Sequence, residues 1–185
     1  MALTKVLTGG IALDAVDNTI LKLDDDYALT GTVTGTDGSI TTATTVAATS
    51  GTAINFTGIP STVSRIMLVF RGVALSGTDQ VMIQLGTSSG LVTSGYISTS
   101  GYGAGAQSRT DSWVWYPGNA TVSGVMTICH MGGNIYSQGH SGKYNTANTS
   151  FGGGDVAVGG VVDRLGIDPA GDATFSAGAI NIMYD

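Results

Sequence analysis

The fold is decided by the stretch Phe175-Ser-Ala-Gly-Ala-Ile-Asn-Ile-Met-Tyr-Asp185. Two sets of side chains alternate along it, namely Ala179, Asn181 and Met183 and, between them, Ile180, Ile182 and Tyr184. Alternation with a period of two places the two sets on opposite faces of a β-strand. We therefore expect a last strand that completes a sheet, with the charged residue Asp185 at the rim of that sheet.

Upstream of this strand, apolar runs separated by turn residues predict further strands. They cover residues 52–57, 63–75, 80–85, 95–99, 112–116, 121–130 and 161–167. The run 63–75 is nearly continuously apolar at its centre, which predicts a strand buried on both faces or covered by a partner protomer. Residues 80–85 are expected to pair back on it as a hairpin, because the turn sequence Ser76-Gly-Thr-Asp79 separates the two.

Glycine and serine interrupt the strand pattern in two places. Residues 100–111 and 132–154 are predicted to be loops, because glycine weakens the interior of a strand. The remaining segments give about eight strands at the spacing of a sandwich. Residues 51–185 are therefore predicted to form an all-β domain, an antiparallel β-sandwich with a jelly-roll-like arrangement.

The beginning of the chain has a different character. Residues 1–35 are predicted to be an arm that packs on a neighbouring protein, and its segment 11–23 fits either a helical stripe or extended structure. Asp24-Asp-Asp26 is interpreted as a solvated acidic turn, because the glycine and closing glutamate of an EF-hand calcium loop are missing. Residues 36–50 are threonine-rich with few large side chains, which predicts an extended connector.

The composition is poor in charge and rich in small residues. Hydrophobic residues make up 42 % of the chain and charged residues 11 %, and 29 residues are glycine. Surfaces of this kind favour association, so we expect a homo-oligomer. The net charge is −6 and the 7 lysines and arginines are scattered, which argues against nucleic-acid binding. Neither a membrane span nor a secretion signal is recognised, so we expect synthesis in the cytoplasm without membrane insertion.

Few residues can carry catalysis. Cys129, the one cysteine, lies in an apolar run and is predicted to be a buried core thiol. His130 and His140 could help to hold a metal ion, or they are a strand-end and a loop side chain. Cys129 and His130 are neighbours on a predicted strand, so they point to opposite faces and cannot form a nucleophile–base pair. The carboxylates are mostly isolated or in turns, so we predict a protein that is not an enzyme and has no cofactor and no bound metal.

Aromatic residues supply the candidates for surface recognition. Trp113, Trp115 and Tyr116 could form a platform on which a sugar ring stacks, or they fill the core or a subunit contact. The predicted loop 132–154 carries aromatic residues among Gly, Ser and Asn, a composition typical of binding loops and equally of a loop without a ligand. Its aromatic and histidine residues are Tyr136, His140, Tyr144 and Phe151. The candidates for receptor or glycan contact are therefore Trp113, Trp115, Tyr116, Tyr136, His140 and Tyr144.

Two groups of short segments resemble phage tail-fibre and virion appendage proteins. The N-terminal leader of that family is similar to Met1-Ala-Leu-Thr-Lys-Val6 and Lys22-Leu-Asp-Asp-Asp-Tyr-Ala-Leu-Thr-Gly-Thr-Val33. Its C-terminal β-module is similar to Phe56–Pro60, Arg65–Val73, Gln84–Gly86, Ser94–Tyr96, Arg164–Ile167 and Phe175–Tyr184. The resemblance covers most of residues 1–35 and 51–185, and loop 132–154 is not clearly matched.

This resemblance implies a structural protein of the virion. The family forms homotrimers, so residues 1–35 would attach to other virion proteins, and the terminal module would be displayed toward a glycan or protein of the host surface. The alternative is a capsid decoration or head-fibre protein with a purely structural role, because residues 28–50, as the only connecting segment, leave little room for a shaft. A glycan-degrading spike is a third hypothesis, and the missing carboxylate pair argues against it.

Overall fold

The structure is a computed structural model that describes residues 40–103, 105–116, 121–145 and 148–185. The arm predicted for residues 1–35, its acidic turn and the start of the connector lie outside the described residues. The described residues form only β-strands and irregular segments, without a helix. The prediction of an all-β fold is therefore confirmed.

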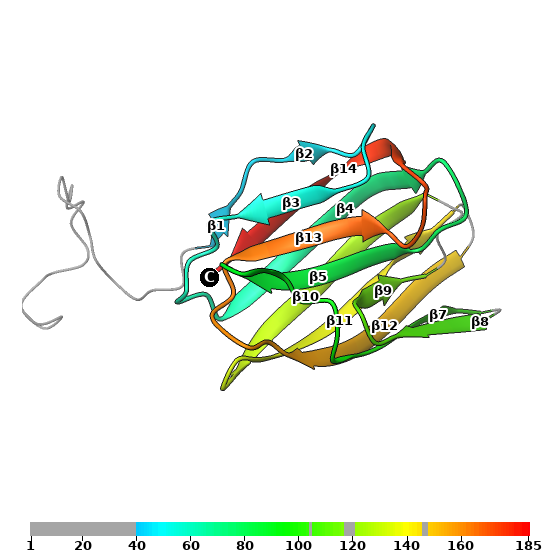
Figure 1. The fold of residues 1–185 in the computed structure, drawn as a ribbon. Coiled ribbons are helices and arrows are strands. Elements are labelled where there is room, and N and C mark those ends of the chain that lie inside the picture. The colour runs from blue at the N-terminus through cyan, green and yellow to red at the C-terminus, as the bar shows by residue number, and fades with distance from the viewer. Residues whose placement is uncertain (1–39, 104, 117–120, 146–147) are drawn as a thin grey trace, which may run out of the picture. The chain divides into compact units, whose positions relative to one another are not determined.

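Two antiparallel sheets face each other (Figure 1). In spatial order the nine-stranded sheet contains β1 (Thr41–Thr42), β14 (Phe175–Tyr184), β4 (Arg65–Leu75), β10 (Val122–Gly132), β11 (Ile135–Tyr144), β12 (Asn148–Ala157), β7 (Tyr96–Tyr102) and β8 (Gly105–Arg109), and β2 (Val46–Ala47) also pairs with β14. The five-stranded sheet contains β3 (Ile54–Thr57), β13 (Arg164–Pro169), β5 (Val81–Thr87) and β6 (Gly90–Leu91), and β9 (Trp113–Trp115) pairs with β5.

The order of the strands follows from a chain that crosses repeatedly between the sheets. β2, β4, β10 and β14 belong to the large sheet, whereas β3, β5 and β13 belong to the small one. The last two strands each lie between two early ones: β13 between β3 and β5, and β14 between β1 or β2 and β4. This is the winding of a jelly roll, in which a long antiparallel hairpin is rolled into two sheets. The strands β11, β12, β7 and β8 extend the large sheet beyond that motif.

The core lies between the two sheets. Ile66, Leu68 and Phe70 of β4 alternate with exposed or half-exposed residues, so the strand is buried on one face. The last strand behaves in the same way, because Ile180 and Ile182 are buried while Asn181 is half-exposed. The alternation predicted for the last strand is thus confirmed. The two-sided burial predicted for residues 63–75 is not seen in the protomer.

Polar contacts across the sandwich hold the two sheets together. The backbone N–H of Leu85 in β5 donates to the buried Tyr96 hydroxyl of β7 at 2.8 Å. The N–H of Val114 in β9 donates to the Ser98 hydroxyl of β7 at 3.0 Å. Buried backbone groups without a partner cost free energy, so these side chains satisfy donors of β5 and β9 that would otherwise be unpaired.

The structure corrects three predictions about connections. β4 and β5 do not form a hairpin; they lie in different sheets, because the turn after Leu75 carries the chain across the sandwich. The segment 132–154 is not a loop but contains most of the pair β11 and β12, and residues 100–111 contain the end of β7 and all of β8. Several glycines in these strands stand where a Cβ has no room: at Gly142 it would lie 2.7 Å from the Trp115 ring, and at Gly154 it would overlap the carbonyl group of Ile97.

Cys129 is also placed differently from the prediction. It is exposed, because the inward positions of β10 are Met126 and Ile128 and Cys129 follows Ile128 on the other face. His130 is exposed as well, and the register of β10 and β11 shifts immediately after it. The apolar run around Cys129 is therefore part of a strand whose residues alternate between the buried and the exposed face.

The second half of the predicted connector joins the sandwich. Thr41 is paired with Tyr184, and Val46 with Ile180, so both short strands extend the large sheet beside β14. Ala48 is fully buried. The described residues from Ile40 to Asp185 accordingly belong to one compact unit.

The sandwich has two ends with different contents. We call the end that holds Thr41, Arg65 and Asp185 the basal end, because β1 starts there and Asp185 forms an ion pair with Arg65. The opposite end, which holds Tyr102, Tyr144 and the start of β12, we call the distal end. Figure 1 shows β1 and the C-terminus at one end and the turn between β7 and β8 at the other.

Candidate functional site

The six predicted contact residues point mainly into the protein. Trp113 and Trp115 are fully buried, and Tyr136, His140 and Tyr144 are at most 8 % exposed. Tyr116 alone is half-exposed. These residues therefore do not form an exposed platform in the protomer. Both tryptophans lie on β9, whose three residues are all buried, so they fill the core as the alternative interpretation proposed.

Several of the predicted residues nevertheless meet in a buried polar network. The Ser100 hydroxyl of β7 lies 2.9 Å from His140 Nε2 of β11, and His140 Nδ1 lies 3.0 Å from Gln138 Oε1. The backbone N–H of Tyr116 donates to the same Ser100 hydroxyl at 3.1 Å. One assignment satisfies all three contacts: Ser100 donates to His140 Nε2, and His140 donates from Nδ1 to Gln138.

Trp115 covers this network. Its ring centroid lies 4.7 Å from that of His140, and its Nε1–H donates to the Ser150 hydroxyl at 2.7 Å. Gly152 faces the His140 ring so closely that any side chain there would collide with it. Burial without a charged partner lowers the pKa of His140 to about 4. The histidine is therefore neutral at physiological pH.

The order serine, histidine, amide resembles a nucleophile with its base and the group that orients the base. A nucleophile must however be reached by its substrate, and Ser100 has no exposed surface. Two carboxylates are engaged in ion pairs: Asp111 pairs with Arg109 and Asp163 with Arg164. The network thus fixes β7, β9 and β11 to one another.

The two histidines lie in different surroundings, one exposed and one buried. His130 lies at the exposed end of β10 and its ring stacks on Tyr136, with centroids 4.7 Å apart and planes inclined by 20°. His140 lies in the buried network. Within the described ranges, no three or more His, Cys, Asp or Glu side chains are grouped so that they could hold a metal ion.

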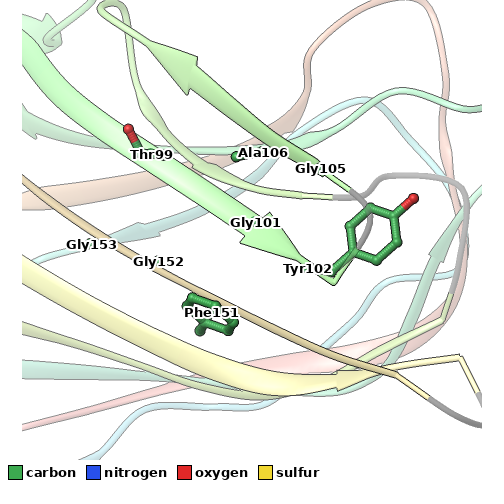
Figure 2. A pocket seen from close by; sticks show the side chains of 8 residues that line it. All are labelled: Thr99, Gly101, Tyr102, Gly105, Ala106, Phe151, Gly152 and Gly153. Atoms are coloured by element: carbon green, nitrogen blue, oxygen red, sulfur yellow. The ribbon is translucent and has the colours of Figure 1, made fainter.

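The outer face of the large sheet carries a shallow hollow of about 640 Å³. It is lined by Thr99, Gly101, Tyr102, Gly105, Ala106, Phe151, Gly152 and Gly153, none of which is charged. Figure 2 shows the Phe151 and Tyr102 rings beside a stretch of backbone that carries almost no side chains. Phe151 is 63 % exposed, an unusual state for so large an apolar side chain.

The strand register builds this hollow. Phe151 of β12 is paired with Gly101 of β7, and Gly101 with Ala106 of β8. Phe151 points outward because its neighbour Ser150 points into the core, where its hydroxyl accepts a hydrogen bond from Trp115 Nε1–H. Since Gly101 and Gly153 have no side chains, the Phe151 ring stands beside bare backbone on two sides.

Two predicted residues support the rim of the hollow from behind. The Tyr102 ring lies 5.5 Å from the Tyr116 ring and 5.1 Å from the Tyr144 ring, measured between centroids. These tilted contacts hold Tyr102 between the distal turns and the hollow. Tyr116 and Tyr144 were predicted as contact residues, whereas Phe151 and Tyr102, which line the hollow, were not among those candidates.

The outward position of Phe151 could have been predicted from the alternation of residues in β11 and β12, which the prediction of a loop overlooked. From Tyr136 every second residue of β11 faces inward, including Gln138, His140 and Tyr144. The same alternation continues in β12 with Ser150 inward and Phe151 outward. Period-two alternation across glycines would have marked Phe151 as an outward aromatic.

No helix in the part of the chain that the structure describes is long and apolar enough to cross a membrane. Comparison of the chain with family models, curated proteins and solved structures found no match.

Proposed function

We propose that this protein is a non-enzymatic structural protein of a phage virion, of the tail-fibre or spike type, whose β-sandwich contacts the host surface. The observation that carries the proposal is the polarity of the domain. The described chain begins at the basal end, while the hollow around Phe151 and the aromatic group around Tyr102 lie toward the distal end. A module attached through its N-terminal side would therefore present the hollow outward.

The absence of catalysis is part of this proposal. Its support is the burial of Ser100 and His140 and the pairing of Asp111 with Arg109 and of Asp163 with Arg164. A contact module needs a rigid, exposed recognition surface rather than groups of tuned pKa. The attachment of residues 1–35 to other virion proteins belongs to the same proposal and concerns residues outside the described range.

We also propose that the protein assembles as a homotrimer through the outer face of β14, β4 and β10. Along this face, Met183 is in register with Met67, and Asn181 with Val69, which in turn is in register with Val125. Val125 is 41 % exposed and the others are half-exposed. Arg65 and Arg71 of β4 are exposed at the two ends of this face, and Arg65 is paired with Asp185. The largely apolar stretch between them would be stabilised by burial against a second copy of the chain.

The assembly is tested by the mass of the full-length protein in solution. Three times the mass of the 18.6 kDa chain is expected. Val69→Asp should give monomers that keep the circular dichroism of β-structure, and Val161→Asp is the matched control, because Val161 is 56 % exposed and outside this face. Monomeric wild-type protein, or a Val69→Asp variant that remains trimeric, would contradict the proposed surface.

The function is tested by the position of the protein on purified particles. Antibodies raised against the full-length chain should label the tail or its spikes in electron micrographs. Labelling spread over the capsid would favour the decoration or head-fibre role instead. Particles that carry no label at all, although the protein is made in infected cells, would refute a virion protein of either kind.

A further inference from the structure

We propose that the hollow around Phe151 binds uncharged saccharides, with one sugar ring stacked on the Phe151 side chain. This inference deepens the proposed function, on which it rests, by naming the class of ligand. None of the six contact residues that the sequence predicted lines this hollow.

The first argument is the exposure of an aromatic ring in a rigid setting. Phe151 is 63 % exposed although it lies within β12, a strand paired on both sides. A pyranose ring presents a face of C–H groups, which packs on an aromatic face, while its hydroxyl groups remain at the edge. The free energy of such a contact comes from burial of the ring and from its electrostatics.

The second argument is the room beside the ring. Gly101, the register partner of Phe151, and Gly153, two residues further along β12, carry no side chains. A Cβ at Gly101 would lie 3.0 Å from the carbonyl oxygen of Gly105, and one at Gly153 would lie 3.3 Å from that of Gln138. Larger residues would disturb the sheet at both positions, and their absence leaves a flat floor on which a planar ligand can lie.

The third argument is the polarity of the lining. The Thr99 hydroxyl group can donate and accept hydrogen bonds to sugar hydroxyls, and it already lies 2.9 Å from the Ser108 hydroxyl. No charged side chain lines the hollow. On β11 and β12 the exposed charged residues are Lys143 and Asp155, which have opposite signs and lie outside the lining.

These features separate an uncharged saccharide from two other ligand classes. A small apolar ligand is normally enclosed over most of its surface, whereas this hollow is shallow and leaves its occupant in contact with water. A ligand rich in hydroxyl groups tolerates that contact. An acidic saccharide would need a cation in the lining to compensate for its desolvation, and the lining has none.

The experiment uses full-length protein and a printed panel of neutral hexose and N-acetylhexosamine oligosaccharides beside uronic acid and sialylated ones. Any neutral oligosaccharide retained on the panel is then measured in solution by saturation-transfer NMR and calorimetry. Binding should weaken about tenfold or more in Phe151→Ala and Phe151→Leu, because both remove the ring. Phe151→Trp should retain binding, because it keeps an aromatic face.

The matched control is Ile97→Ala. Ile97 is 68 % exposed on β7 of the same sheet and does not line the hollow, so its removal should leave the affinity unchanged. Retention of affinity in Phe151→Leu would mean that apolar bulk suffices, which overturns the stacking. A preference for acidic sugars, or no binding of any neutral sugar, overturns the ligand class.

Failure of this inference can be told apart from failure of the proposed function. If the wild-type protein and Phe151→Ala bind host cells equally well, the host-contact role stands and the hollow is not the contact. If neither protein binds cells and particles carry no label, the proposed function fails together with the inference.

Discussion

Acid should destabilise this protein through a single buried group, His140. Its pKa is about 4 in the folded protein, because burial disfavours the charged ring, whereas an imidazole exposed to solvent, as in the unfolded chain, has a pKa of 6.5. The folded-state pKa is lowered, so between these two values the unfolded chain takes up a proton that the folded chain refuses. The free energy of unfolding therefore falls as the pH drops from about 6.5 to about 4.

The size of the effect follows from the difference between the two pKa values. One pKa unit corresponds to about 1.4 kcal/mol, so the full loss is roughly 3 kcal/mol, of which about 2 kcal/mol is lost by pH 5. Arginine hydrogen bonds lower the pKa of Asp111 and of Asp163, so both lose their contribution only below the ordinary aspartate range. Burial raises the pKa of Asp168, which acts with the opposite sign and offsets part of the loss.

The assay is urea unfolding of the full-length protein at several pH values from 7.5 to 4.5. The comparison that isolates the histidine is His140→Gln, which keeps a side chain able to hydrogen-bond Ser100 but cannot take up a proton in this range. Between pH 7.5 and pH 5 the free energy of unfolding of this variant should fall by about 2 kcal/mol less than that of the wild-type protein. His130→Gln is the control for removal of an exposed histidine. A wild-type slope that His140→Gln leaves unchanged would refute the reasoning.

Three further predictions concern the sheet. Gly154→Ala should lower the free energy of unfolding by about 2 kcal/mol or prevent folding, because a Cβ there would overlap the carbonyl group of Ile97. Gly139→Ala on the open face should change the midpoint of thermal unfolding little, and equal effects of the two substitutions would contradict this. Cys129 should react with a thiol reagent in the folded protein as fast as in urea, since it is exposed; marked protection would contradict its position. Deletion of Asn181–Asp185 should abolish folding, because it removes pairing along β4; a soluble, cooperatively folded product would contradict this.

The parts of the fold that the sequence predicts are those with large apolar residues at every second position. Ile180 and Ile182 identified β14, and Ile54 and Phe56 identified β3, because in these strands the buried face carries bulky side chains. A pattern of this kind survives without any knowledge of the partner strand. The jelly-roll-like arrangement followed from the number and spacing of such strands.

The strands β11 and β12 escaped prediction for a physical reason. In this part of the sandwich the space between the sheets is filled from one side by Trp115 and from the other by His140, so the facing residues Gly142 and Gly152 must be small. Glycine is favoured there by packing although it is unfavourable for a strand in isolation. A single sequence does not reveal which side chain occupies the space of a missing Cβ.

The pairing of β4 and β5 illustrates a different difficulty. The turn after Leu75 is compatible with a hairpin, yet β5 pairs with β13 and β14 pairs with β4. Long-range pairing of this kind depends on the last strands of the chain, so it cannot be inferred from a turn alone. The hollow depends on the same long-range register, which brings Phe151 beside Gly101.

The most direct test of the account is competition for adsorption to host cells. Cells incubated with purified full-length protein should adsorb fewer particles than untreated cells, in proportion to the protein added, because the module occupies the surface that the particles need. Phe151→Ala should compete at least about tenfold less well, in line with the loss of one stacked ring. Particle adsorption that is unaffected by saturating wild-type protein would contradict the claim that this domain contacts the host.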